Sequence, residues 1–86
     1  MVLFSIQWRN STKKDSRNLP KQEVAHIIDA VSLLADDPMP HGSQKLSGSE
    51  RSYRIRIGDY RVIYEVFTDS HTVEIQRVRH RKDVYR

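Results

Sequence analysis

Arginines and one tyrosine in the C-terminal part of the chain are the residue types best suited to chemistry. Residues 51–86 contain nine Lys/Arg, eight of them arginine, against five Asp/Glu, whereas residues 1–50 carry six of each sign. The formal net charge of +4 therefore lies entirely in the later segment. A guanidinium keeps its charge at any working pH and grips phosphate through a planar fork. This distribution predicts a phosphate-bearing polymer or an acidic protein as partner, with a merely solvated basic face as the alternative.

The sequence offers little for a metal site or a disulfide. It contains no cysteine, and its four histidines are scattered without a paired ligand spacing. We therefore expect no metal and no cofactor. The N-terminal segment MVLFSIQWRN lacks the pattern of a signal peptide. No apolar run approaches the roughly 20 residues of a membrane span. These features predict a cytoplasmic protein that does not enter a membrane.

The length of 86 residues predicts a single domain over residues 1–86 with a small core. The first half predicts a strand over residues 2–8, a weak helix over residues 11–17 capped by Asn10 or Ser11, and a second helix that begins at Pro20. In the second helix, apolar residues recur at helical spacing: Val24, Ile27, Ile28, Val31 and Leu34 or Ala35. Two prolines and two glycines predict a loop over residues 38–48.

The second half predicts three antiparallel strands. Alternating Tyr53, Ile55 and Ile57 form the first, Gly58-Asp59 is a hairpin turn, and residues 60–67 form a central strand. Residues 72–79 form the last strand, whose pattern slips near Arg77 and Val78 and so indicates a bulge or the end of the strand. Residues 80–86 form a tail. The expected order is β-α-α-β-β-β, a small mostly antiparallel sheet with two N-terminal helices on one face, in the α+β class. Alternation predicts that most of four aromatic residues lie in the core: Trp8, Tyr53, Tyr60 and Tyr64.

The runs YRIRIGDYRVIYEV (53–66) and VRHRKDVYR (78–86) resemble the C-terminal half of RelE/ParE-superfamily toxins. LPKQEV (19–24), LADDPMPHG (34–42) and QKLSGSERSYRIRIGDYR (44–61) follow in the order and spacing of that family. The resemblance covers nearly the whole chain. It implies a toxin of a type II toxin–antitoxin system, of the RelE type, that cuts messenger RNA in the ribosomal decoding site without a metal. It also implies a RelB-like antitoxin that wraps the toxin and holds it inactive.

RNA cleavage through the 2′-hydroxyl needs a base for that hydroxyl, positive charge for the crowded phosphorane, and a proton for the leaving 5′-oxygen. The resemblance assigns Arg61 to the scissile phosphate, Arg81 to transition-state charge and the leaving group, and Tyr85 to the general base. For Arg61 the alternative is a rim ion pair, for example with Glu65. For Arg81 it is an exposed tail cation, and for Tyr85 it is an aromatic that packs the tail onto the sheet.

Five further residues are candidates for binding RNA phosphate: Arg54, Arg56, Lys45, Arg79 and His80. For Arg54 and Arg56 the alternative is a basic strand face that holds an antitoxin or ribosomal RNA, and for Lys45 it is a solvated surface lysine. A well-known RelE has lysines where this chain has Arg54 and Arg56, and arginine effectively cannot lose its proton. The base must then be Tyr85 or His80. Arg79 stands where relatives usually have glycine. Two other functions remain open from the sequence: a ParE-like inhibitor of DNA gyrase without nuclease activity, and a catalytically inert homologue that only binds antitoxin or RNA.

Overall fold

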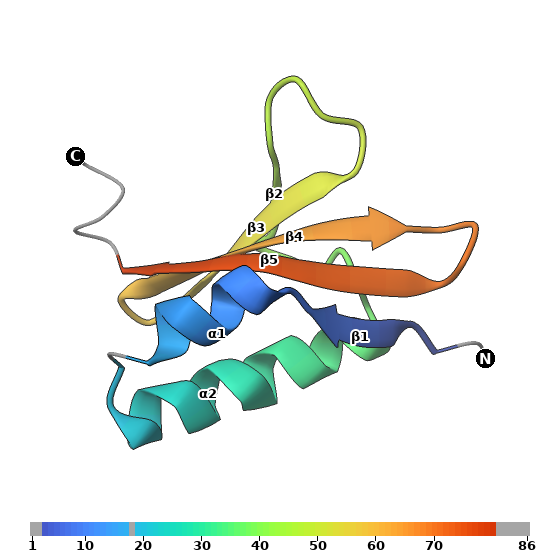
Figure 1. Ribbon diagram of the computed structural model, residues 1–86. Coiled ribbons are helices and arrows are strands. Elements are labelled where there is room, and N and C mark those ends of the chain that lie inside the picture. The colour runs from blue at the N-terminus through green and yellow to red at the C-terminus, as the bar shows by residue number, and fades with distance from the viewer. Residues whose placement is uncertain (1–2, 18, 81–86) are drawn as a thin grey trace.

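The sheet at the centre of the molecule has five strands in the order β1-β5-β4-β3-β2, as seen in the computed structural model, which describes residues 3–17 and 19–80 (Figure 1). β1 pairs with β5 in parallel, and the other neighbours are antiparallel. In chain order the elements are β1 (Ser5–Trp8), α1 (Asn10–Ser16), α2 (Lys21–Ser32), the short 3-10 helix η1 (Leu33–Ala35), β2 (Gln44–Lys45), β3 (Ser52–Ile57), β4 (Tyr60–Phe67) and β5 (Thr72–His80).

This arrangement confirms the predicted α+β fold with two N-terminal helices. Two short elements were missed. The second helix was predicted to continue to Leu34 or Ala35, but α2 ends at Ser32 and η1 follows it. The sequence also predicted a loop over residues 38–48. Gln44 and Lys45 instead pair with Arg54 and Tyr53 as the edge strand β2. A strand of two residues has too few positions for any alternation to show. None of the helices in the described residues is long and apolar enough to cross a membrane.

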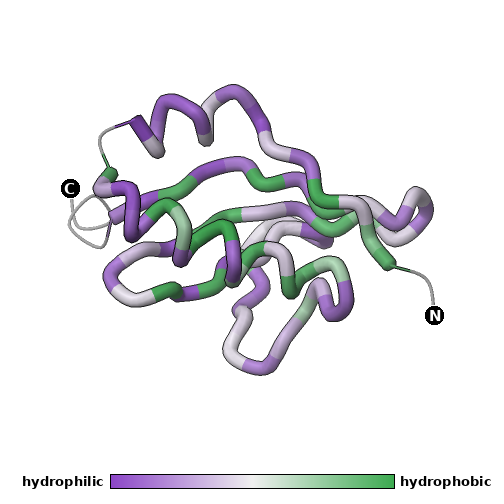
Figure 2. Tube along the Cα trace, turned by 90° about the horizontal axis from the view of Figure 1, so that it is seen from below, coloured by the Kyte–Doolittle hydropathy of each residue, from purple (hydrophilic) through white to green (hydrophobic). Residues whose placement is uncertain are grey.

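Polar contacts hold α1 to the sheet. Its residues are hydrophilic throughout, whereas α2 and the central strands mix hydrophobic and hydrophilic residues (Figure 2). The predicted caps are wrong: Arg9 is the N-cap and makes no side-chain cap bond. The Ser11 hydroxyl instead donates to the Gln76 carbonyl at 2.6 Å. Asp15 accepts the Val78 N–H at 2.9 Å and both fork nitrogens of Arg77 at 3.0 and 3.1 Å. The lack of an apolar stripe on α1 is therefore offset by hydrogen bonds.

α2 covers one face of the sheet, which we call the covered face. Pro20 is its N-cap rather than its first residue, a shift of one position. Ile27 and Val31 are buried, but Ile28 is half exposed, so the buried stripe is narrower than the spacing predicted. Alternate residues of β4 and β5 complete the core: Tyr60, Val62, Tyr64, Val66, Val73, Ile75 and Val78.

Two irregularities in the strands were predicted correctly. Tyr60 pairs with Ile57, so Gly58 and Asp59 form a two-residue turn, with Gly58 at φ +60° where a side chain would be strained. In β5 the register shifts, because Ile63 pairs with Arg77 while Tyr64 pairs with Ile75. Gln76 is the extra residue of this bulge, which turns the end of β5 relative to its start.

Candidate functional site

Three arginines lie side by side across the sheet. Arg56 on β3 is directly opposite Arg61 on β4, and Arg61 is directly opposite Arg79 on β5. Directly opposed residues share a face, and their Cβ atoms are about 4.5–5.5 Å apart. Tyr60 and Val62, on either side of Arg61, are buried on the covered face. The arginines therefore project from the other face, which we call the open face. We call these three residues the basic row.

Neutral groups hold the arginines at this end of the open face. Arg54, two residues before Arg56 and on the same face, donates two hydrogen bonds to the Gln44 amide oxygen at 3.1 and 2.7 Å. The Arg56 Nε donates to the Gly58 carbonyl at 3.1 Å. Within residues 3–17 and 19–80, no ion pair joins Arg54 or the basic row to a carboxylate. Like charges directly opposite one another destabilise a sheet, so this end of the face is suited to an anion.

A cavity of about 230 Å³ opens among these side chains. Gly42 and Gln44 line it from the loop and β2, and Arg54, Arg56 and Arg61 line it from β3 and β4. All three arginines are at least partly accessible. Their forks can thus meet an incoming phosphate without any movement of the sheet.

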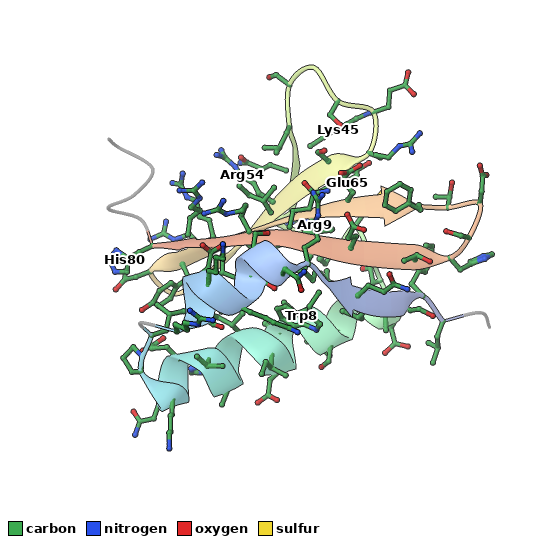
Figure 3. The ribbon with its side chains drawn as sticks, in the orientation of Figure 1. Trp8, Arg9, Lys45, Arg54, Glu65 and His80 are labelled. Atoms are coloured by element: carbon green, nitrogen blue, oxygen red, sulfur yellow. The ribbon has the colours of Figure 1, made fainter. Side chains whose placement is uncertain are left out.

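The opposite end of the open face carries carboxylates. Glu65 on β4 is directly opposite Glu74 on β5. The Gln76 amide donates to both of them. Arg9 lies 3.6 Å from Glu74, so its charge is paired. Figure 3 shows Arg9, Glu65 and Arg54 on the side of the sheet away from α2. The alternative partner expected for Arg61, Glu65, is therefore engaged by Gln76.

Two of the predicted phosphate-binding residues lie apart from the basic row. His80 is opposite Tyr60 in the sheet, and the two rings pack edge-on with centroids 5.1 Å apart. His80 therefore lies on the covered face (Figure 3). Lys45 is exposed and lies opposite Tyr53, so that alternation turns Gln44 rather than Lys45 toward Arg54. Arg81 and Tyr85 lie outside the described residues. Of the predicted site, the structure thus brings together Arg54 and the basic row.

The buried tyrosines of the covered face have raised pKa values, so they hold their hydroxyl protons more tightly than an exposed tyrosine does. Burial, reinforced by the charge of Asp37, raises the pKa of Tyr64 to about 12, despite a hydrogen bond with Ser43 that lowers it. The Tyr64 hydroxyl donates to the Pro38 carbonyl at 2.9 Å. Burial, with Glu23 and Asp59 adding to it, also raises the pKa of Tyr60. These two tyrosines are core residues, as predicted.

Trp8 differs from that prediction. It is 38% exposed and lines an apolar groove of about 320 Å³ between α1 and α2 (Figure 3). The groove also exposes Ile28 and is closed by buried or half-buried residues: Thr12, Leu19, Val24 and Ile27. Trp8 lies opposite the buried Ile75, but β1 is an edge strand with a neighbouring strand on one side only. In the described part of the chain, no three His, Asp or Glu side chains gather as a metal site would require.

Sequence reasoning missed Gln44. Its amide contact with Arg54 depends on the pairing of β2 with β3, and the sequence showed no sign of that strand. A glutamine in a segment rich in Pro, Gly and Ser is ordinary. Only the register between the two strands identifies it as part of the site.

A five-stranded sheet with helices on one face and, among the described residues, arginines without a carboxylate partner on the other defines a small α+β protein. The family model for the ParE toxin of type II toxin–antitoxin systems, parDE, matches residues 6–85. The chain therefore belongs to this toxin family, within the RelE/ParE superfamily.

Curated relatives and solved structures agree with this assignment. The chain is 28% identical over 86 residues to the putative toxin RelE1 of Methanocaldococcus jannaschii, covering 96% of both chains. It is 32% identical over 80 residues to toxin RelE3 of the same organism, covering 84% of both. The fold matches the toxin of the archaeal RelE–RelB complex from Pyrococcus horikoshii with a TM-score of 0.81, 27% identity and coverage of 92% of this chain and 96% of that one. For the toxin–antitoxin complex RelBE2 from Mycobacterium tuberculosis the TM-score is 0.80, with 26% identity and coverage of 92% and 99%.

Proposed function

We propose that this toxin is a ribosome-dependent endoribonuclease that cuts messenger RNA through the 2′-hydroxyl of its substrate, with no metal in the reaction. The observation that carries the proposal is the basic row, in which three facing arginines have no carboxylate partner among the described residues. Similarity to proteins named RelE and RelG toxins also favours it. A ribosomal substrate would require the protein to act in the cytoplasm.

The reaction needs little beyond charge and proton transfer. The 2′-oxygen attacks phosphorus, the bond from phosphorus to the 5′-oxygen breaks, and a 2′,3′-cyclic phosphate and a 5′-hydroxyl are left. Arg61 would contact the scissile phosphate, because it lies at the centre of the basic row with a cation on each side. Preorganised donors aimed at developing negative charge are worth about 10²–10³ in rate each.

Proton transfer would fall to residues other than the basic row. A guanidinium effectively cannot act as a base, so Arg54, Arg56 and Arg79 would hold phosphate and offset charge. On the family resemblance, we assign the base to Tyr85. Arg81 would meet the transition-state charge and stabilise the leaving 5′-oxygen, which takes its proton from water. His80, which lies on the covered face against Tyr60, is the less suitable base.

An antitoxin of the RelB kind is the partner that we propose for the free toxin. The similar structures include complexes of RelE with RelB. This chain offers two surfaces to such a partner, the basic open face for acidic side chains and the groove with exposed Trp8 and Ile28 for apolar ones. The core is small, so a tightly bound partner would also stabilise the toxin.

The chemistry of the cut ends tests the proposal. Purified toxin is added to a translating extract, and the ends of a reporter message are mapped for the wild type, Arg61→Ala and Tyr85→Phe. We expect new 3′ ends that carry a cyclic phosphate or 3′-phosphate, greatly reduced by both substitutions. Uncut message, or cuts that are equal for all three proteins, would reject the nuclease.

Gyrase inhibition is the second candidate, because the matching family model is named for ParE. A ParE-like toxin would block DNA supercoiling without breaking any bond in RNA. A supercoiling assay with purified gyrase distinguishes the two, since the nuclease should leave gyrase unaffected.

A further inference from the structure

The hydrogen bonds from Arg54 to Gln44 fix the orientation of one guanidinium at the basic end of the open face. Both Nε and Nη2 of Arg54 donate to the same amide oxygen, at 3.1 and 2.7 Å. A guanidinium has five N–H donors in a rigid plane, so two bonds from one edge aim that edge at Gln44 and leave the other donors available. The contact comes from register, because Gln44 is directly opposite Arg54 across β2 and β3.

The acceptor that holds Arg54 carries no net charge. Elsewhere on the molecule, arginines are held by carboxylates: Arg9 by Glu74, and Arg77 by Asp15. At the basic end the acceptors are the Gln44 amide and the Gly58 carbonyl. A carboxylate would orient the guanidinium equally well but would cancel its charge. An amide gives the orientation and leaves the full charge for an anion.

We propose that Gln44 is a positioning residue of the RNA site, which orients Arg54 toward a phosphate of the bound strand without neutralising it. The inference rests on the proposed function, because it takes the anion to be RNA phosphate. Gln44 and Arg54 line the same cavity as Arg56 and Arg61, so a phosphate held there would lie beside the basic row. The role explains why the facing residue on the edge strand is a glutamine.

Two substitutions at Gln44 separate the orientation of the Arg54 guanidinium from its charge. Gln44→Glu keeps the acceptor in place but neutralises Arg54, whereas Gln44→Ala removes the acceptor and leaves the charge. Gln22→Glu makes the same chemical change on α2, where Gln22 is exposed on the helix layer, and serves as the matched control. The probe is a fluorescent oligouridylate with 2′-O-methyl groups, which cannot be cut through its 2′-oxygens. Binding is measured over a range of salt concentrations.

We expect Gln44→Glu to weaken binding roughly tenfold or more at low salt, as for the loss of one charged hydrogen-bonded contact. Its slope of log K against log salt should shrink by about 0.7, the value for one phosphate contact to a single strand. Gln44→Ala should weaken binding several-fold with an unchanged slope, and Gln22→Glu should match the wild type. Melting temperatures should agree among the variants, since Gln44 is exposed.

Three results would overturn the inference: a wild-type protein that does not bind the probe, a Gln44→Glu variant that binds like Gln22→Glu, or equal slopes for the two Gln44 variants. The proposed function is judged separately, by end mapping in the extract. Cleavage with no effect of Gln44 would refute only the positioning role. Oligouridylate binding that follows these expectations without any cleavage would refute only the nuclease.

Discussion

The covered and open faces of the sheet use the same strands in opposite ways. On the covered face, alternate residues of β4 and β5 are largely apolar and buried, and the buried Tyr64 hydroxyl has an acceptor in the Pro38 carbonyl. On the open face, Arg61 lies between two other cations and has no carboxylate partner in the described chain. The first arrangement lowers the free energy of the folded state, whereas the second raises it. Because the facing arginines cost stability beside a well-packed core, their role is better explained by binding than by stabilisation of the fold.

The largest expected effect on stability comes from the covered face. Ile75 on β5 is fully buried and lies opposite Tyr64 of β4, so Ile75→Ala should lower the free energy of unfolding by about 2–5 kcal/mol through lost burial and a new cavity. Arg56→Ala, on the open face, should change it by no more than about 0.5 kcal/mol. Denaturant unfolding of both variants provides the measurement. Similar losses for the two would remove the distinction between the faces.

A smaller effect is expected from the buried hydroxyl. Tyr64→Phe removes the hydrogen bond to the Pro38 carbonyl and should cost about 1 kcal/mol at neutral pH. The loop from Pro38 to β2 would lose its anchor in the core. Denaturant unfolding at pH 7 measures this cost, and a variant as stable as the wild type would show that the anchor contributes nothing.

The same tyrosine makes stability depend on pH in the alkaline range. Because the pKa of Tyr64 is raised from 10.0 to about 12 by burial, the folded protein holds this proton more tightly than the unfolded chain does. The contribution of this bound proton to the stability of the fold is therefore fully present below pH 10 and is lost as the pH rises from 10 to about 12. Across this pH range, the melting temperature should fall more steeply for the wild type than for Tyr64→Phe. Parallel curves would contradict the assignment.

The smallest expected effect has the opposite sign. Arg61→Gln should raise the free energy of unfolding by about 0.2–1 kcal/mol at low salt, because it relieves repulsion with Arg56 and Arg79. The gain should fade at high salt, where exposed charges are screened. Thermal melts at two salt concentrations test this. A loss of stability at low salt would mean that Arg61 has a structural partner.

The sequence was sufficient for the two strands that carry Arg56 and Arg61. Alternation in residues 53–57 and 60–67 predicts both the buried set and the opposite direction of Arg61, and the hairpin at Gly58 then fixes Arg56 opposite Arg61. It was insufficient where contacts depend on three dimensions. β2 is too short for an alternating pattern to show. α1 is held by side-chain hydrogen bonds to β5 that no sequence pattern indicates. The face of β5 on which His80 lies depends on how the bulge at Gln76 shifts the register. The roles of Arg81 and Tyr85 stay predictions from the family resemblance.

The rate of message cleavage on programmed ribosomes tests the central claim most directly, with Arg61→Ala compared against Arg51→Ala. Arg51 is an exposed arginine just before β3 whose guanidinium lies over the Phe67 ring, outside the basic row. If the basic row holds the scissile phosphate, Arg61→Ala should slow single-turnover cleavage by about 10²–10³ while Arg51→Ala cleaves at the wild-type rate. Equal rates for the two variants would contradict the account.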